Sequence, residues 1–396
     1  MNRPTLRLRP KMDPRRIRHG FPWVYQNELV LDRRSRAIPA GTIATLEDSE
    51  RRYLATVAVN TGSKITGRVL SRDTEAVIDR SWLAAHIGAA LTLRERLYDA
   101  PYYRLIHAEA DGLPGCVIDR FGEAVVVQPN AAWIEVMLED LVAVLSDIPG
   151  VTTILKNASG RARKLEGLDE ESAILLGGVD GPVPVPMNGA TYMADLTGGQ
   201  KTGLFYDQRP NHAFVAGLAR GTEVLDVFSH VGGFALAAVA NGATHALAVD
   251  GSDAALSLAR DGAKAMGVSD RFETRKGDAF EVLAGLAEEG RQFGTVICDP
   301  PAFAPSKQAL DAGLRAYERI ARLATPLVAP GGTLTLCSCS HAAGLDAFRT
   351  ASLRGVGRAG GAAQILRTGF AGPDHPQHPS LAESGYLKAI TLRLLP

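Results

Sequence analysis

The stretch that decides the fold is VLDVFSHVGGF, residues 224–234, in which an apolar run leads into a polar turn and two glycines. An apolar run with this ending is typical of the first strand, turn and helix of a doubly wound α/β sheet. Paired glycines let the backbone come close to a ligand at a helix start. Because the spacing is not the GxGxxG of dinucleotide folds, pyrophosphate binding is less favoured.

The chain after about Ala194 continues as short apolar strands, most of them separated by helical runs. Helical patterns occupy 255–266 and 280–289. Strands are expected at EVLDVF (223–228), HALAVDG (245–251), RFETRKG (271–277), FGTVICDPP (293–301) and GTLTLCSCS (332–340). This alternation predicts an α/β domain with a mainly parallel, doubly wound sheet. The tail YLKAITLRLL (386–395) alternates like a final strand, which we expect to be an antiparallel edge.

The part of the chain before this sheet has two other patterns. Alternating apolar and polar residues between turn signals predict a β-rich module, with strands at 41–47, 52–59 and 64–71. A small α+β middle domain is expected to follow, with helices over 81–98 and 132–146 and two strands within 108–129. The proline-containing stretch 181–196 is interpreted as a connection. The predicted domains are therefore 1–75, 76–190 and 191–396.

Composition limits the class of protein. With 396 residues, 46% hydrophobic and 22% charged, the chain has ordinary globular usage, which argues against a disordered or fibrous protein. No apolar run approaches the ~20 residues of a membrane helix. Four cysteines are too few for a disulfide scaffold, and no hydrophobic signal segment follows the first methionine. We therefore expect a cytoplasmic protein without membrane contact.

Basic residues are concentrated near the start of the chain. The totals balance at 43 basic and 43 acidic residues, but fifteen Lys or Arg stand against six Asp or Glu through Arg72. Arg15, Arg16 and Arg18 lie in this part, as expected of a surface that meets the phosphates of a nucleic acid. The alternatives are a solvated charged face or an Arg-rich transit peptide, and Asp13, the prolines and the strand-like alternation fit a transit peptide poorly.

Ligands of doubly wound sheets bind beyond the carboxyl ends of the strands, so the residues that end each predicted strand are candidates for the site. Asp250 ends the second strand, where a carboxylate can accept hydrogen bonds from both hydroxyls of a ribose. NAD and S-adenosylmethionine would both use that interaction. Asp278 ends the third strand, where it or a neighbouring backbone group can meet an adenine amino group. Either aspartate can instead be a helix N-cap.

The fourth strand ends in CDPPAF, residues 298–303. Here Asp299 offers an acceptor or proton relay for the edge of a base, the two prolines make the turn rigid, and Phe303 offers a face for stacking. The alternative is a proline-ended strand with a core phenylalanine. An acid and two prolines at a strand end in this fold match a methyltransferase site better.

The fifth strand ends in CSCS, residues 337–340. Alternation along a strand places Cys337 and Cys339 on one face, with Cys339 nearer the end where a substrate would lie. Cys339 is therefore the better nucleophile, and Cys337 fits a small buried side chain. Because the other cysteines, Cys116 and Cys298, form no CxxC pair, a zinc site is disfavoured and we expect no metal.

VLDVFSHVGGF, GDAF (277–280), CDPPAF and CSCS, in this order, resemble class I methyltransferases that modify RNA at cytosine C5. Further segments extend the resemblance over nearly the whole chain: 18–29, 63–71, 111–122, 198–209 and 385–394. Together they are similar to the RlmI-like large-subunit ribosomal RNA cytosine-C5 methyltransferases. The resemblance implies an N-terminal PUA domain, a Rossmann-like class I methyltransferase domain, S-adenosylmethionine as cofactor and ribosomal RNA, of the 23S class, as partner.

The resemblance also implies roles for single residues. Cys339 would be the nucleophile and Asp299 the residue that holds the base, with Pro300 and Phe303 beside the base. The cofactor would contact Phe228, Ser229, Gly232, Asp250, Asp278, Ala279, Gln208 and Arg209. The family usually has Tyr-Thr before the paired glycines, where this chain has His230-Val231, a departure that concerns local contacts and not the fold.

The implied chemistry explains why a cysteine is needed. Cytosine C5 is a poor nucleophile until a thiolate adds to C6. A free thiol has a pKa of ~8.5, so Cys339 needs a lowered pKa or assistance from a base. The base that removes the C5 proton is not identified; His341 is a candidate, although a lone histidine after a strand is more often a surface residue.

Three other functions are compatible with parts of the sequence. An exocyclic-amine methyltransferase acting on N2 of guanine or N6 of adenine would need DPPxF alone, with Cys339 incidental. A dinucleotide oxidoreductase is disfavoured by the missing GxGxxG, and a non-catalytic RNA-binding protein by the intact set of strand-end residues. The sequence leaves open the modified nucleotide, the choice between free RNA and an assembly intermediate, and the oligomeric state, for which a homodimer is one option.

Overall fold

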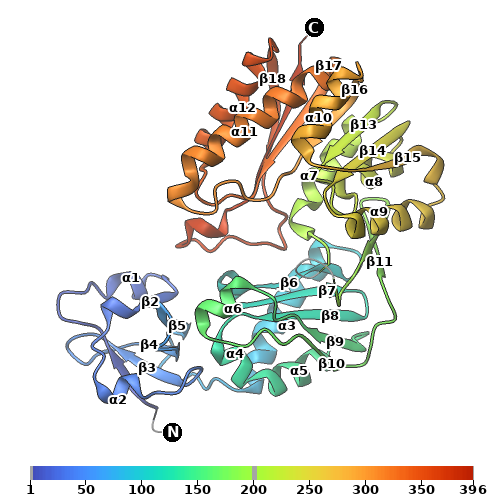
Figure 1. The fold of residues 1–396 in the computed structure, drawn as a ribbon. Coiled ribbons are helices and arrows are strands. Elements are labelled where there is room, and N and C mark those ends of the chain that lie inside the picture. Colours follow the sequence, from blue (N-terminus) through green and yellow to red (C-terminus); the bar gives the residue numbers. More distant parts are fainter. Residues whose placement is uncertain (1–2, 199–202, 396) are drawn as a thin grey trace. The chain divides into compact units, whose positions relative to one another are not determined.

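The computed structural model describes residues 3–198 and 203–395 and forms two compact units (Figure 1). Unit 1 comprises Met1–Gly181, Leu196–Gly203 and Pro373–Leu381. Unit 2 comprises Pro182–Asp195, Leu204–Gly372 and Ala382–Pro396. No helix in the described part of the chain has the length and apolar character needed to cross a membrane. The domain limits 1–75, 76–190 and 191–396 stay predictions.

The first sheet of unit 1 is a small β module with strand order β1-β3-β4-β5-β2. Its strands are β1 (Thr5–Arg7), β2 (Trp23–Tyr25), β3 (Ile43–Glu47), β4 (Tyr53–Val59) and β5 (Ile65–Ser71), with the short helices α1 (Arg15–Arg18) and α2 (Arg33–Arg36). Alternation in β3 directs Ala44 and Leu46 into a core that also buries Val24 and Val57. The β-rich module expected from the sequence is confirmed.

The second sheet of unit 1 has the order β10-β9-β8-β7-β6. Its elements are α3 (Arg80–Leu97), β6 (Tyr102–His107), β7 (Cys116–Phe121), β8 (Ala124–Pro129), α4 (Ala132–Val136), α5 (Leu138–Ser146), β9 (Thr153–Lys156), α6 (Arg161–Glu166) and β10 (Ala173–Leu176). The single helix expected over 132–146 is interrupted at Met137, where the chain turns so that Trp133 and Leu141 both reach the same core.

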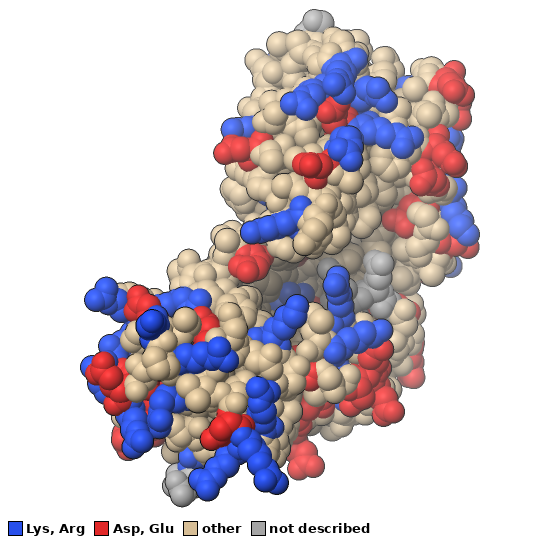
Figure 2. Space-filling view, turned by 60° about the vertical axis from the view of Figure 1, so that its left-hand side comes forward, with Lys and Arg blue, Asp and Glu red and all other residues tan. Residues whose placement is uncertain are grey.

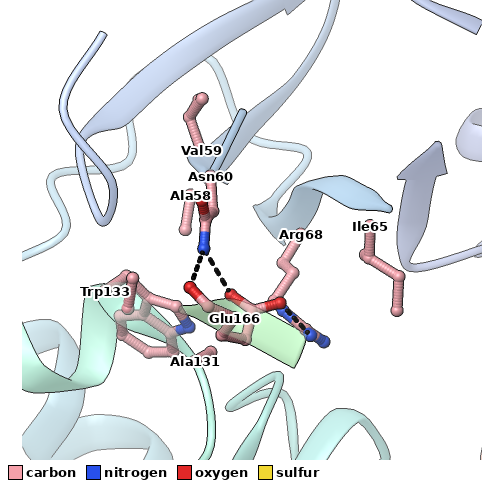
Figure 3. A pocket seen from close by; sticks show the side chains of 9 residues that line it. Ala58, Val59, Asn60, Ile65, Arg68, Ala131, Trp133 and Glu166 are labelled. Carbon is pink, nitrogen blue, oxygen red and sulfur yellow. Dashed lines mark hydrogen bonds and ion pairs between the residues drawn. The ribbon is translucent and has the colours of Figure 1, made fainter. Parts of the chain in front are cut away.

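A buried polar group joins the two sheets of unit 1. Glu166 accepts hydrogen bonds from Asn60 Nδ2 at 3.0 Å, Ser63 Oγ at 2.7 Å and Arg68 Nη2 at 3.0 Å, beside a small cavity also lined by Trp133 (Figure 3). The Arg68 guanidinium also reaches a second carboxylate, of Glu109, at 2.9 Å. Because these buried groups are paired, they fix the β module on the middle sheet.

The C-terminal segment Pro373–Leu381 belongs to unit 1 although its neighbours in sequence belong to unit 2. Asp374 anchors it: its carbonyl accepts from Arg94 Nη2 at 3.0 Å, and its Oδ2 accepts from the backbone amide of Arg104 at 3.0 Å. Arg94 is fully buried and makes a two-pronged ion pair with Asp111 at 2.7 Å. Buried charges of this kind are costly to separate, so the segment is firmly held.

Unit 2 contains the predicted doubly wound sheet. Its seven strands have the order β15-β14-β13-β16-β17-β19-β18, and those from β15 to β17 are parallel. Their bounds are β13 (Glu223–Val227), β14 (His245–Asp250), β15 (Phe272–Lys276), β16 (Phe293–Cys298), β17 (Val328–Ser338), β18 (Ala363–Gly369) and β19 (Lys388–Leu394). The predicted α/β fold class is confirmed.

The last strand corrects one expectation. β19 is antiparallel to β17, as predicted, but it is not the edge, because β18 pairs with its other side. β18 leaves Gln364, Ile365 and Leu366 exposed and therefore lacks a clear apolar alternation. That weak pattern is typical of an edge strand, and it explains why 363–369 was not expected to be a strand.

Helices cover both faces of the unit 2 sheet (Figure 1). One face carries α7 (Arg209–Leu218), α8 (Gly233–Ala240) and α9 (Asp253–Ala265), and the other carries α10 (Ala279–Glu288), α11 (Leu310–Ala324) and α12 (Leu345–Arg358). The expected connection at 181–196 is instead the hairpin β11 (Val183–Met187) and β12 (Ala190–Ala194). Asn188 and Gly189 form its turn with φ of 55° and 77°, the left-handed pair of a tight hairpin.

Candidate active site

The loop after β13 is built from unusual backbone conformations. Phe228 and His230 have positive φ of 63° and 50°, and Gly232 follows with φ of 82° as the N-cap of α8. Such conformations are costly for residues with side chains and cluster at functional sites. The Ser229 hydroxyl is buried in this loop and has no hydrogen-bond partner among the described residues. The loop thus holds a buried polar atom next to a helix start.

A buried carboxyl group lies beneath this loop. Asp226 is fully buried in β13, and its Oδ2 accepts a hydrogen bond from the backbone amide of Ala235 at 2.9 Å. Burial, with a smaller contribution from the charge of Asp250, raises the pKa of Asp226 to about 7. Its Oδ1 has no partner among the described residues. Sequence analysis did not single out Asp226, although an acid inside the apolar run VLDV was a visible signal.

Asp250, which ends β14, and Asp278, which precedes α10, differ in their contacts. Asp250 accepts from the backbone amides of His230 at 2.9 Å and Ser252 at 2.8 Å, while Ser252 itself caps α9. Asp278 Oδ1 accepts from the backbone amide of Phe280 at 2.9 Å and is the N-cap of α10. Asp250 therefore supports the glycine loop, whereas Asp278 has the capping role that the sequence offered as an alternative.

Gln208 and Asp299 meet at the ends of η3 (Tyr206–Gln208) and β16. Gln208 Nε2 donates to Asp299 Oδ2 at 2.9 Å, and Gln208 Oε1 accepts from Asn211 Nδ2 at 2.7 Å. The second bond fixes the direction of the Gln208 amide. Arg209, the next residue, starts α7 and places its guanidinium 5.5 Å from the centre of the Tyr206 ring. Residues 199–202 of the segment 198–209 lie outside the described residues.

Cys339 lies directly after β17 and beside the DPPAF loop. Its Sγ is 4.0 Å from the carbonyl oxygen of Pro300, and the side chain is partly exposed. Cys337, Cys298 and Cys116 are buried, and burial raises the pKa of each of their thiols. Of the four cysteines, Cys339 therefore combines partial exposure with a contact to Pro300, the residue after Asp299.

A hydroxyl network holds the strand end against the DPPAF loop. The Tyr317 hydroxyl lies 2.8 Å from the hydroxyls of both Ser338 and Ser340. Ser340 Oγ also accepts from the backbone amide of Ala304 at 3.0 Å. Phe303 packs on the same tyrosine, with ring centres 5.0 Å apart. The serines on either side of Cys339 thus fix its backbone, a role that sequence reasoning missed.

Comparisons with known proteins show the family to which the chain belongs. The model of the S-adenosylmethionine-dependent methyltransferase family matches residues 173–382, and that of the PUA-like domain matches 6–72. The chain is 35% identical to the ribosomal RNA large subunit methyltransferase of Deinococcus radiodurans, over 99% of this chain and 98% of that protein. It is 33% identical to the ribosomal RNA large subunit methyltransferase I of Erwinia tasmaniensis, over 94% of this chain and 95% of that protein. The chain belongs to the ribosomal RNA large subunit methyltransferase I family.

More distant proteins share the fold of this member of the ribosomal RNA large subunit methyltransferase I family. A structure from Streptococcus mutans that carries the description of a SAM-dependent methyltransferase matches with a TM-score of 0.81 at 19% identity, over 98% of this chain and 100% of that one. The structure of SMU.776 in complex with SAH matches with a TM-score of 0.82 at 18% identity, over 99% and 100%. At these identities the likeness shows the fold. The family match itself establishes S-adenosylmethionine as the cofactor.

The residues of this family member fit that cofactor. Ser229 Oγ and Asp226 Oδ1 are buried polar atoms that lack partners among the described residues, so a polar ligand in the loop would satisfy them. Asp250 is partly exposed, with its carboxylate oriented by two backbone amides. Where the structure describes the chain, no group of three or more His, Cys, Asp or Glu is arranged to hold a metal ion.

The basic residues predicted to bind RNA lie together on α1 of the PUA-like domain. Arg16 pairs with Glu28 at 2.6 Å and Arg18 with Asp48 at 3.2 Å, whereas Arg15 is exposed at the surface. Lys and Arg side chains are spread over the face of unit 1 that Figure 2 shows. Arg15 and Arg18 are both exposed, but among the described residues of α1 Arg15 is the arginine without a salt bridge, so its charge is available to a phosphate.

Proposed function

We propose that the chain methylates C5 of a cytosine in 23S ribosomal RNA through a covalent bond between Cys339 and the base. One observation supports this reading most strongly: the partly exposed Cys339 thiol lies beside the Asp299–Pro300 loop, 4.0 Å from the Pro300 carbonyl oxygen. The names of the relatives, ribosomal RNA large subunit methyltransferases, support the class of RNA. Family membership supports the methyl donor.

Residues around the β13 loop would hold S-adenosylmethionine, whose sulfonium supplies an electrophilic methyl group when bound. Asp250 would accept hydrogen bonds from the ribose hydroxyls, and Ser229 and the Gly232 backbone would meet the polar end of the ligand. The remaining proposed contacts come from Phe228, Asp278, Ala279, Gln208 and Arg209. Phe228 packs near Phe303, with ring centres 6.3 Å apart, so the cofactor loop and the base loop touch.

The chain's own residues perform the covalent step on the base. Cys339 Sγ forms a bond to C6 of cytosine as the C5–C6 double bond gives way, which makes C5 nucleophilic. A proton held between the Asp299 carboxyl group and N3 stabilises the electron density that arrives at N3, and Gln208 keeps that carboxyl group in place. Once C5 carries the methyl group, a base removes the C5 proton and the bond between sulfur and C6 breaks. His341, the predicted candidate for that base, is exposed after β17.

Nucleoside analysis tests this function. Hypomethylated ribosomal RNA is incubated with labelled S-adenosylmethionine and the wild type, Cys339→Ala or Cys337→Ala, and the methylated nucleosides are identified by mass spectrometry. We expect label in 5-methylcytosine with the wild type and with Cys337→Ala, the matched control whose thiol is buried. Label is expected to disappear with Cys339→Ala. Label in N2-methylguanine or N6-methyladenine that survives Cys339→Ala would establish the amine reaction instead.

A further inference from the structure

A buried lysine lies under the turn that carries Cys339. Lys388, the first residue of β19, is 4% exposed. Its Nζ donates to the carbonyl oxygens of Ser340 at 2.7 Å and Ala343 at 2.8 Å. Within the described ranges no carboxylate forms a salt bridge with it. A lysine is rarely buried without a paired acid, so we expect another negatively charged group near the Lys388 ammonium.

The strand register explains how Lys388 reaches the turn. Lys388 is directly opposite Ser338 in the antiparallel pair of β17 and β19. Its side chain then extends past the end of β17, and the two carbonyls that it binds belong to the residues after Cys339. These hydrogen bonds fix the turn 340–343, in addition to the hydroxyl network of Tyr317.

The charged and titratable groups near Cys339 come from four elements. Burial lowers the pKa of Lys388, and the charge of a Cys339 thiolate opposes that effect. From α11, Tyr317 is buried, and both its burial and the Cys339 charge raise the pKa of its phenol. Cys337 lies on β17, and its pKa is raised first by burial and second by the charge of Asp299 at the end of β16. Among these groups the ammonium of Lys388 is the cation that can offset a thiolate at Cys339.

We infer that Lys388 is a positioning residue for Cys339, which holds the turn after the cysteine and supplies the positive charge that stabilises its thiolate. This inference rests on the proposed function, in which Cys339 is the nucleophile. Lys388 is buried and directed at two carbonyls, so it acts through Cys339 and not on the base. The proton of the thiol is released to solvent, and the ammonium keeps its own protons.

The pH dependence of Cys339 alkylation tests this role without RNA. The full-length chain is treated with iodoacetamide between pH 6 and 10, and the Cys339 peptide is quantified by mass spectrometry. For Lys388→Met we expect the midpoint of alkylation to rise by about one pH unit, and the rate at pH 7 to fall about tenfold. Lys388→Arg, which keeps the charge, should retain the wild-type midpoint. Lys388→Gln, which keeps a donor without the charge, should behave like Lys388→Met and replaces it if that variant does not fold.

A second control separates charge from structure. Thr335→Val removes a buried hydroxyl from the same strand pair, β17 and β19, but leaves Lys388 and the turn after Cys339 in place, so the midpoint of alkylation should not move. Equal midpoints for the wild type, Lys388→Met and Lys388→Gln would overturn the inference. If Cys339→Ala keeps its methylation activity, the proposed function fails instead, whatever the alkylation profile. The two failures are therefore distinguishable.

Discussion

The side-chain amide of Gln208 donates a hydrogen bond of 2.9 Å to Asp299 Oδ2, joining residues that are 91 positions apart in the sequence. Gln208 is buried, and Asn211 holds its other end at 2.7 Å. The hydrogen bond from Gln208 therefore helps to set the orientation of the Asp299 side chain. A chain of two buried amides sets the direction of the carboxylate that we propose to hold the base.

Gln208→Ala should reduce methyl transfer without unfolding the chain. The change removes a donor from Asp299 and leaves the Asn211 amide with its longer hydrogen bond, of 3.3 Å, to the Phe370 carbonyl, a loss of about 1–3 kcal/mol. We expect kcat/KM for RNA methylation to fall about 10- to 100-fold. Gln308→Ala, at an exposed glutamine of the same unit, is the matched control and should stay at the wild-type value. Equal kcat/KM for both variants would show that this hydrogen bond does not serve catalysis.

The raised pKa of Asp226 should make unit 2 less stable as the pH rises. Burial raises this pKa from 3.8 to about 7, so the folded chain retains a proton that the unfolded chain loses between these values. Retention of this proton by Asp226 stabilises the folded chain fully below about pH 4, and this stabilisation is lost as the pH approaches 7. Asp226→Asn cannot ionise. Its free energy of unfolding in urea, relative to the wild type, should therefore increase between pH 4 and 7, by at most about 1.4 kcal/mol per pH unit. A constant difference over this range would contradict the assignment.

Arg15→Gln should weaken RNA binding chiefly through electrostatics. Arg15 is exposed, whereas Arg16 and Arg18 already face Glu28 and Asp48. We expect the plot of the logarithm of the RNA association constant against the logarithm of the salt concentration to have a shallower slope. The change should be about 0.7–0.9, the contribution of one phosphate contact. Arg349→Gln removes an exposed charge from unit 2 and serves as the control. Filter binding over a salt series measures both slopes, and an unchanged slope for Arg15→Gln would remove this residue from the RNA surface.

The catalytic sheet was predictable because its signals are local. Apart from the polar edge strand β15, each parallel strand contains an apolar run, and the polar residues that follow, such as Asp250 and Asp299, mark the carboxyl ends where ligands bind. The order of the motifs then indicated the class of methyltransferase. The hairpin at 183–194 carried a local signal too, Asn188-Gly189, but the surrounding prolines suggested a connection instead.

The missed features depend on contacts between distant segments. Nothing near Lys388 in the sequence indicates that its amine lies under the turn after Cys339, because strand pairing between β17 and β19 creates that proximity. In the same way, the contacts of Asp374 with Arg94 and Arg104 join segments that are far apart in the sequence. Local patterns locate strands and their ends, whereas buried polar networks appear once the register is known.

The proposed mechanism requires a covalent bond between Cys339 and the target cytosine. RNA in which 5-fluorocytosine replaces cytosine tests it directly, because fluorine at C5 leaves no proton to remove after methyl transfer and the bond between sulfur and C6 cannot break. With S-adenosylmethionine present, the wild type and Cys337→Ala should accumulate an RNA–protein adduct that survives denaturing electrophoresis, with the RNA attached to the Cys339 peptide. Cys339→Ala should form no adduct. A wild-type enzyme that methylates ordinary RNA but gives no adduct with the fluorinated RNA would contradict the account.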